Sequence, residues 1–182
     1  MPTGSGPCRF GQYCIFMEDL VNKLKIPDVA MFSLSSENAY DGLPTSLHRR
    51  AWWGVLLSDV LEDIRSMLLA NAKERDTAMA LFQTRFQEIL AALRTGKFDE
   101  LERVLKQCTA VLARVPLKRP VAQVPVISLM GEIFVRRDGL SRQYLTEQLA
   151  AKGFATVCAP VAEWVLYSDY LAHSGLSDRT PN

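Results

Sequence analysis

The sequence has few features that identify a function by themselves. It contains four cysteines and two histidines, and 21 basic residues nearly balance 20 acidic ones, for a formal net charge of +1. Such a balance gives no general attraction to nucleic acid or to an anionic membrane. No apolar run approaches the ~20 residues that cross a bilayer, and residues 1–10 lack the apolar stretch of a signal peptide. We therefore expect a cytoplasmic protein with neither nucleic-acid nor membrane partners.

Several catalytic and cofactor signatures are also missing. The sequence has no GxxxxGK[ST] phosphate loop and no GxGxxG after an expected strand. It has no GxSxG or HExxH motif, which leaves hydrolase interpretations unsupported. His48 and His173 are isolated and have no second ligand at metal spacing. The cysteines form no CxxC pair, so their spacing alone predicts neither a zinc ribbon nor a disulfide framework.

What is present is enough apolar material for a core, since hydrophobic residues make up 48% of the 182 residues. Residues 1–45 are expected to begin an α/β unit, with an amphipathic helix over about 8–24 and a strand over 29–34. No strand is expected before Cys8. Because ligand-binding loops of parallel sheets normally follow a strand, this start suggests a fragment of a longer protein.

Residues 46–115 are predicted to form a helical insertion. Ser46 is the expected N-cap of a first helix, and its apolar stripe runs from Trp52 to Leu68. Two further helices are expected over about 74–93 and 99–112, because apolar residues recur there at three- and four-residue steps. Short links between the three helices indicate that they pack on one another or on a neighbouring sheet.

Residues 120–182 are predicted to form a βαβ unit and a C-terminal helix. The run VPVISLMGEIF is continuously apolar, which indicates a strand buried on both faces in a parallel sheet. A helix over 140–152 separates it from a second strand, FATVCAP, and a last helix is expected over 161–171. The chain as a whole is therefore predicted to be of the α/β class.

Five segments of the sequence resemble one known family. The segment GPCRFGQY, at residues 6–13, resembles a motif of CoA-substrate-specific enzyme activases that are fused or linked to 2-hydroxyacyl-CoA dehydratase-like domains. Four more segments resemble the same family in the same order: FSLSSENAY (32–40), RRAWWG (49–54), GEIFVR (131–136) and APVAEWVLY (159–167). The resemblance covers most of the chain except the helices between about 70 and 120.

The resemblance implies both a fold and a function. Proteins of this family hold iron–sulfur clusters through cysteine thiolates at the ends of flavodoxin-like sheets. Their activators deliver an electron at very low potential, and their dehydratases use it to remove water from a 2-hydroxyacyl thioester. The implied fold is a partial flavodoxin-like parallel sheet with a helical insertion. The implied function is the cluster-binding or cluster-supporting part of such a system, a dehydratase (lyase)-like or reductase component that is inactive alone.

Cys8 is the predicted thiolate ligand, and a [4Fe–4S] cluster is the implied cofactor. A cysteine in a Gly/Pro loop before a helix has its thiolate favoured by the helix dipole, and Arg9 adds a positive charge. The alternative is a structural cysteine that caps the helix. Cys14, Cys108 and Cys158 are expected to be packing residues. Because a cluster needs about four ligands, the others are expected from other domains or subunits, or from a homodimer.

Glu132 and Arg136 are the other predicted binding residues, because they follow the expected βα turn in GEIFVR. They could hold a substrate carboxylate or order a cluster loop, and the alternative is a local ion pair. Trp164 and Tyr167, three residues apart, are expected to pack in the core.

Two other functions remain open. The chain could be a structural or interaction module whose helices dock other domains. It could also be a thiol enzyme with Cys8 as nucleophile, although no histidine is placed to serve as its base.

Overall fold

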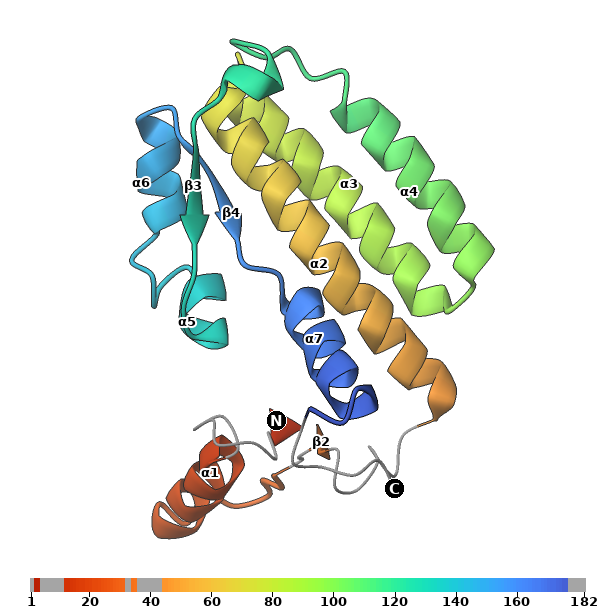
Figure 1. The fold of residues 1–182 in the computed structure, drawn as a ribbon, viewed down its shortest axis with the longest axis vertical. Helices are drawn as coiled ribbons and strands as arrows, with labels where there is room; N and C mark the ends of the chain where they lie inside the picture. The colour runs from red at the N-terminus through yellow and green to blue at the C-terminus, as the bar shows by residue number, and fades with distance from the viewer. Residues whose placement is uncertain (1, 4–11, 32–33, 36–43, 177–182) are drawn as a thin grey trace. The chain divides into compact units, whose positions relative to one another are not determined.

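The computed structural model describes residues 2–3, 12–31, 34–35 and 44–176. The chain divides into two compact units, Met1–His48 and Arg49–Asn182, and each unit is described by itself. The described part is of mixed α/β type and mostly helical, and it contains two two-stranded parallel sheets (Figure 1).

The first unit contains the strands β1 (Pro2–Thr3) and β2 (Leu34–Ser35) and the helix α1 (Gln12–Lys23). The two strands pair in parallel, with Pro2 opposite Leu34. The expectation that no strand precedes Cys8 was therefore wrong, because a two-residue strand has no periodic pattern that could reveal it. The strand predicted over 29–34 is wrong over residues 29–31 and correct at Leu34, where β2 begins, while residues 32–33 lie outside the described residues.

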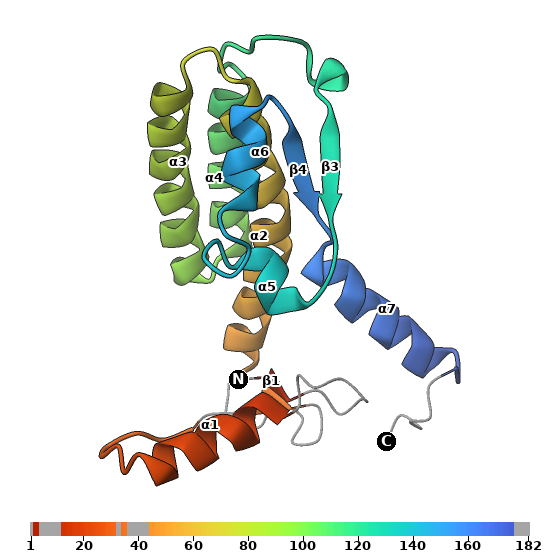
Figure 2. The ribbon, with the colours of Figure 1, turned by 90° about the vertical axis from the view of Figure 1, so that its left-hand side faces the viewer.

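Three long helices dominate the second unit: α2 (Thr45–Asn71), α3 (Arg75–Thr95) and α4 (Phe98–Leu112). They lie side by side in both ribbon views (Figure 2). Gly96 ends α3 in the left-handed conformation, at φ 71°. The fully or nearly buried side chains shared by these helices form the main core: Leu61, Leu68, Phe82, Ile89, Ala92, Leu101, Cys108 and Leu112. The helical periodicity of the sequence predicted these elements because packing of their apolar faces stabilises them.

A parallel strand pair lies against the end of α2 in this unit. It consists of β3 (Val126–Leu129) and β4 (Ala155–Cys158), paired from Val126↔Ala155 to Leu129↔Cys158. The short helices η2 (Val121–Gln123), α5 (Ile133–Arg137) and α6 (Leu145–Ala151) flank the strands, and α7 (Val161–His173) follows β4. A small second core joins Leu69 and Ala70 of α2 to Val124, Ala150 and Ala155.

Three buried hydroxyl groups tie β4 to the neighbouring helices. Thr156 Oγ1 of β4 lies 3.0 Å from Ser66 Oγ of α2 and 3.1 Å from Thr146 Oγ1 of α6. The backbone N–H of Thr156 also donates to Ser66 Oγ at 2.6 Å. All three residues are buried, and the Thr156 hydroxyl is the hydrogen-bond partner that the Ser66 and Thr146 hydroxyls share.

Several details of this unit differ from the sequence-based expectations. Strand β3 is not buried on both faces, since Val126 is 50% exposed. Ile133 and Phe134 belong to α5 instead of extending the strand. The helix expected over 140–152 is formed only as α6, because Gln143 and Tyr144 adopt positive φ values of 53°.

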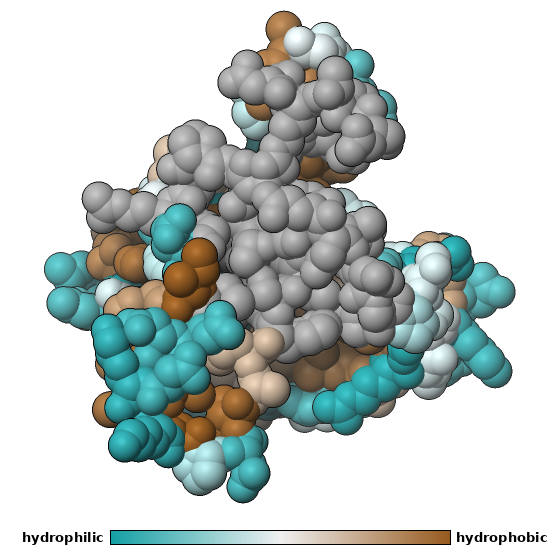
Figure 3. Space-filling view, turned by 90° about the horizontal axis from the view of Figure 1, so that it is seen from below, coloured by the Kyte–Doolittle hydropathy of each residue, from teal (hydrophilic) through white to brown (hydrophobic). Residues whose placement is uncertain are grey.

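The expected core packing of Trp164 and Tyr167 is wrong. Trp164 is 47% exposed and Tyr167 57% exposed, and Ala162 is the buried residue of α7 among those whose side chains the structure describes. Apolar side chains also reach the surface in the view from below (Figure 3). Among the described residues, no helix is long and apolar enough to cross a membrane.

Candidate functional site

The carboxyl ends of β3 and β4 meet at one edge of their sheet, where Leu129 pairs with Cys158. The segment that follows β3 leads into α5, and the segment that follows β4 leads into α7 (Figure 1). Ligands of parallel α/β sheets bind outside the carboxyl ends of the strands. This edge is therefore the place in the second unit where a functional site is expected.

Glu132 and Arg136 both lie at this edge, but they stabilise the chain locally. Glu132 is the N-cap of α5, and its Oε2 accepts a hydrogen bond from the Val135 N–H at 2.8 Å. Arg136 Nη1 donates to the Gly131 carbonyl at 2.7 Å. Glu132 and Arg136 do not form an ion pair with each other, so the alternative of a local ion pair between them is wrong. The two side chains hold the turn between β3 and α5 in one conformation.

Asp59 of α2 connects the two segments at this edge. Its Oδ1 accepts a hydrogen bond from the Val161 N–H at 3.2 Å, and its Oδ2 accepts one from the Ala162 N–H at 2.9 Å. The same carboxylate forms an ion pair with Arg137 at the end of α5. Asp59 is only 8% exposed. A carboxylate from a distant helix thus caps the positive N-terminus of α7 and fixes Arg137 beside it.

Glu62 and Arg142 form a second buried link between α2 and the same edge. Arg142 Nη2 lies 3.0 Å from Glu62 Oε1, and its Nη1 also donates to the Arg136 carbonyl at 2.9 Å. The Arg142 side chain is only 8% exposed. Glu62 is half-buried and also pairs with Arg65, so the expected cost falls mainly on Arg142, whose nearly buried charge would lose its carboxylate partner if Glu62 were removed. We call Asp59, Glu62, Asp63, Arg136, Arg137, Arg142 and Cys158 the edge cluster.

Cys158 lies at the centre of the edge cluster as a free, buried thiol. Its Sγ donates to the Arg136 carbonyl at 3.4 Å and accepts from Arg142 Nη1 at 3.6 Å. Burial raises the pKa of the thiol above its ordinary value, although the guanidinium groups of Arg137 and Arg142 act in the opposite direction. The thiol form is therefore favoured, which suits a packing residue better than a nucleophile or a metal ligand.

Asp63 is the least well paired carboxylate of the edge cluster. Burial raises its pKa, with a further contribution from the neighbouring charges of Asp59 and Glu62, while Arg137 lowers it. Its Oδ1 is buried without a hydrogen-bond partner. The ionised form of Asp63 is thus less stable in the folded protein than in water.

The predicted ligands Cys8 and Arg9 lie outside the described residues, as does the side chain of Cys14. Cys108 is fully buried between α3 and α4, as expected for a packing residue. In the part of the chain that the structure describes, no group of three or more His, Cys, Asp or Glu side chains could hold a metal ion.

Sequence reasoning missed Asp59, Glu62, Arg137 and Arg142. The first two are separated by one helical turn of α2 and so share a face. This spacing could have indicated a buried polar contact, because acidic residues on the buried face of a helix need hydrogen-bond or ion-pair partners. Their partners lie about 80 residues further along the chain, which no local pattern reveals.

No family model, curated protein or solved structure matches the chain.

Proposed function

We propose that the chain is the cluster-binding or cluster-supporting part of a low-potential electron-transfer system like that of the 2-hydroxyacyl-CoA dehydratases and their activases. One observation carries this proposal: three of the five segments that resemble the family come directly after parallel strands in the sequence, whereas FSLSSENAY contains a strand and RRAWWG lies within α2. In the second unit, GEIFVR follows β3 and APVAEWVLY follows β4. In the first unit, GPCRFGQY follows β1, and FSLSSENAY includes β2.

This arrangement agrees with a partial flavodoxin-like sheet, the finer fold that we propose. In such sheets the carboxyl edge carries the ligand-binding loops. Cys8 is then the proposed thiolate ligand, and Arg9 beside it favours the thiolate. The described residues do not complete a ligand set. The remaining ligands are therefore expected from elsewhere in the assembly, and the edge cluster has the supporting role of holding the turns after β3 and β4.

The test is iron and sulfide content with an absorption spectrum, measured on the full chain reconstituted without oxygen. We expect bound iron and broad absorption near ~400 nm, both lost in Cys8→Ser. Cys108→Ala is the control, because Cys108 is fully buried in the helical core and is expected to be a packing residue, and this variant should keep the iron. A folded, colourless wild-type protein, or a Cys8→Ser variant that retains the iron, would contradict cluster binding by Cys8.

A second candidate, an interaction module without chemistry of its own, is favoured by the outer face of α7. Trp164, Tyr167 and Tyr170 are exposed on this helix although they are large apolar residues. Exposed aromatic side chains in a group are typical of protein interfaces. Light scattering on the iron-free chain tests this function. A concentration-dependent mass that Tyr167→Ser lowers would support it, and a monomer at all concentrations would count against self-association.

A further inference from the structure

The end of the second unit where β3 begins is built from three segments that the backbone holds together. Just beyond α2, the Lys73 N–H donates to the Pro116 carbonyl at 2.9 Å, and the Lys118 N–H donates to the Asn71 carbonyl at 2.8 Å. Ala72 and Leu117 form an antiparallel bridge between these contacts. The third segment, at the end of α6, lies close by, since a Cβ added at Gly153 would lie 3.3 Å from Arg119 Nη2.

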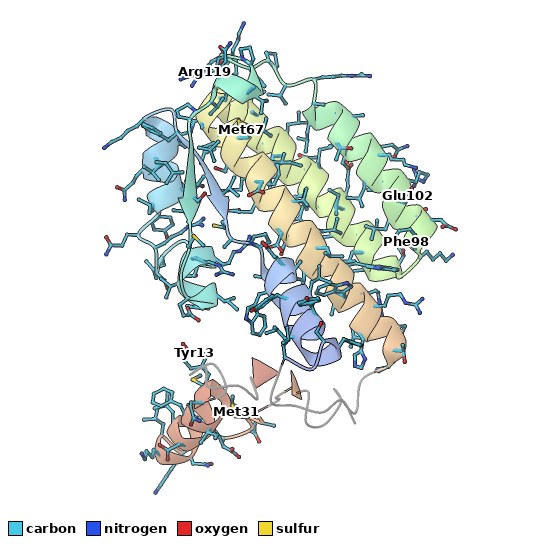
Figure 4. The ribbon with its side chains drawn as sticks, in the orientation of Figure 1. Tyr13, Met31, Met67, Phe98, Glu102 and Arg119 are labelled. Carbon is cyan, nitrogen blue, oxygen red and sulfur yellow. The ribbon has the colours of Figure 1, made fainter. Side chains whose placement is uncertain are left out.

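The Asn71 side chain strengthens this junction. It is buried, donates to the Arg119 carbonyl at 2.8 Å, and accepts from the Arg119 N–H at 3.2 Å. Both contacts use the backbone of Arg119, so its guanidinium remains on the surface (Figure 4). The junction is thus preorganised, which reduces the entropy lost when a partner binds.

The three segments of this junction contain six basic residues, and five of them are exposed while Arg75 is half-buried. We call them the basic end: Lys73, Arg75, Arg114, Lys118, Arg119 and Lys152. None of the six takes part in an ion pair with the described residues. Elsewhere in the unit, basic residues such as Arg65, Arg103 and Arg142 are paired with glutamates.

The basic end carries a much larger excess of positive charge per residue than the chain as a whole. Residues 71–76, 114–120 and 152–153 together contain six basic residues and two acidic ones, Glu74 and Asp76. The chain as a whole has a formal net charge of only +1. A local excess of positive charge on a near-neutral protein attracts an anionic partner to one place and not to the whole surface.

The composition of the three segments favours a protein partner over other polyanions. They contain no aromatic residue on which a base could stack, as single-stranded nucleic acid requires. They also contain no exposed large apolar side chain that could enter a membrane beside the charges. We propose that the basic end is a docking surface for a partner protein that presents an acidic face.

The proposal can be tested with a fluorescein-labelled oligoglutamate peptide as the probe. Its binding to the full chain is followed by fluorescence anisotropy at low and at physiological salt. The test variant is the double substitution Lys118→Glu and Arg119→Glu. The control is Arg103→Glu with Lys106→Glu, which makes the same change in net charge on the exposed face of α4.

We expect the wild-type chain to bind the peptide and salt to weaken the binding, because surface charges are screened within about 10 Å at moderate salt. The test variant should bind at least ~tenfold more weakly, and the control should change by less than about twofold. Equal losses in both variants, or no binding by the wild-type chain at low salt, would overturn the proposal. So would tighter binding of a DNA duplex or of phosphatidylserine vesicles that the test variant abolishes, since that would assign the basic end to another class of partner.

Discussion

Replacing Asp59 with asparagine tests whether one buried carboxylate holds α7 and α5 together. The carboxylate accepts hydrogen bonds from the Val161 and Ala162 N–H groups and is ion-paired with Arg137. Asparagine has nearly the same shape and is itself a good N-cap residue, so part of the cap survives the substitution. What is lost is the negative charge.

The expected cost follows from the burial of the two charges. The interaction of a carboxylate with a helix N-terminus contributes about 0.3–1 kcal/mol. Removing one partner of a fully buried ion pair costs about 3–5 kcal/mol. The Arg137 side chain is 21% exposed, so water compensates part of this loss. We expect Asp59→Asn to lower the free energy of unfolding by about 2–4 kcal/mol.

Urea unfolding followed by circular dichroism measures this change, with Glu100→Gln as the control. Glu100 pairs with Arg103 on the surface of α4, where their side chains are 42% and 55% exposed, and a pair of this kind contributes about 0–1 kcal/mol. In the Asp59→Asn variant, the amide hydrogens of Val161 and Ala162 should also exchange faster than those of α3. If Asp59→Asn costs no more than Glu100→Gln, the reasoning about the edge cluster is refuted.

Three further predictions concern stability in the same unit. Because burial raises the pKa of Asp63, its contribution to folding is most favourable below the ordinary pKa and is lost as the pH rises through the raised value. Asp63→Asn should therefore be more stable than the wild type near neutral pH and equal to it at ~pH 3. Urea unfolding at a series of pH values measures this, and a variant less stable than the wild type near neutral pH would contradict it. Thr156→Val leaves two buried hydroxyls without their shared partner and should cost about 1–3 kcal/mol of unfolding free energy; an unchanged urea midpoint would count against it. Ile89→Ala should cost about 2–5 kcal/mol, because Ile89 is 1% exposed in the main core, and a thermal midpoint within a degree of wild type would be incompatible with that packing.

The sequence predicted the elements whose signal is local and repeated. The helices α3 and α4 each show apolar residues at helical spacing over several turns. The burial of Cys108 was predicted correctly from its position in a helical apolar stripe, and that of Cys158 from its position in an apolar strand. These predictions succeeded because the same pattern that forms the element also buries it.

The features that the sequence did not reveal depend on contacts between distant segments or on very short elements. Helix α5 has five residues, fewer than two turns, so its apolar start could not be distinguished from the end of β3. The capping of α7 by Asp59 joins residues about 100 positions apart. The exposure of Trp164 could not be inferred either, because it depends on what packs against α7. The roles of Cys8 and Arg9 stay predictions.

The bridge between Ala72 and Leu117 has a consequence for how sequences of this kind can diverge. It brings the start of α3 and the end of α4 together. The two helices therefore form a hairpin whose two ends join the rest of the fold at the same place. A relative could carry a longer, shorter or different hairpin there and still connect α2 to β3 in the same way, provided that the apolar face of α2 remained covered. Chimaeras that exchange residues 73–116 should therefore keep the edge cluster in place.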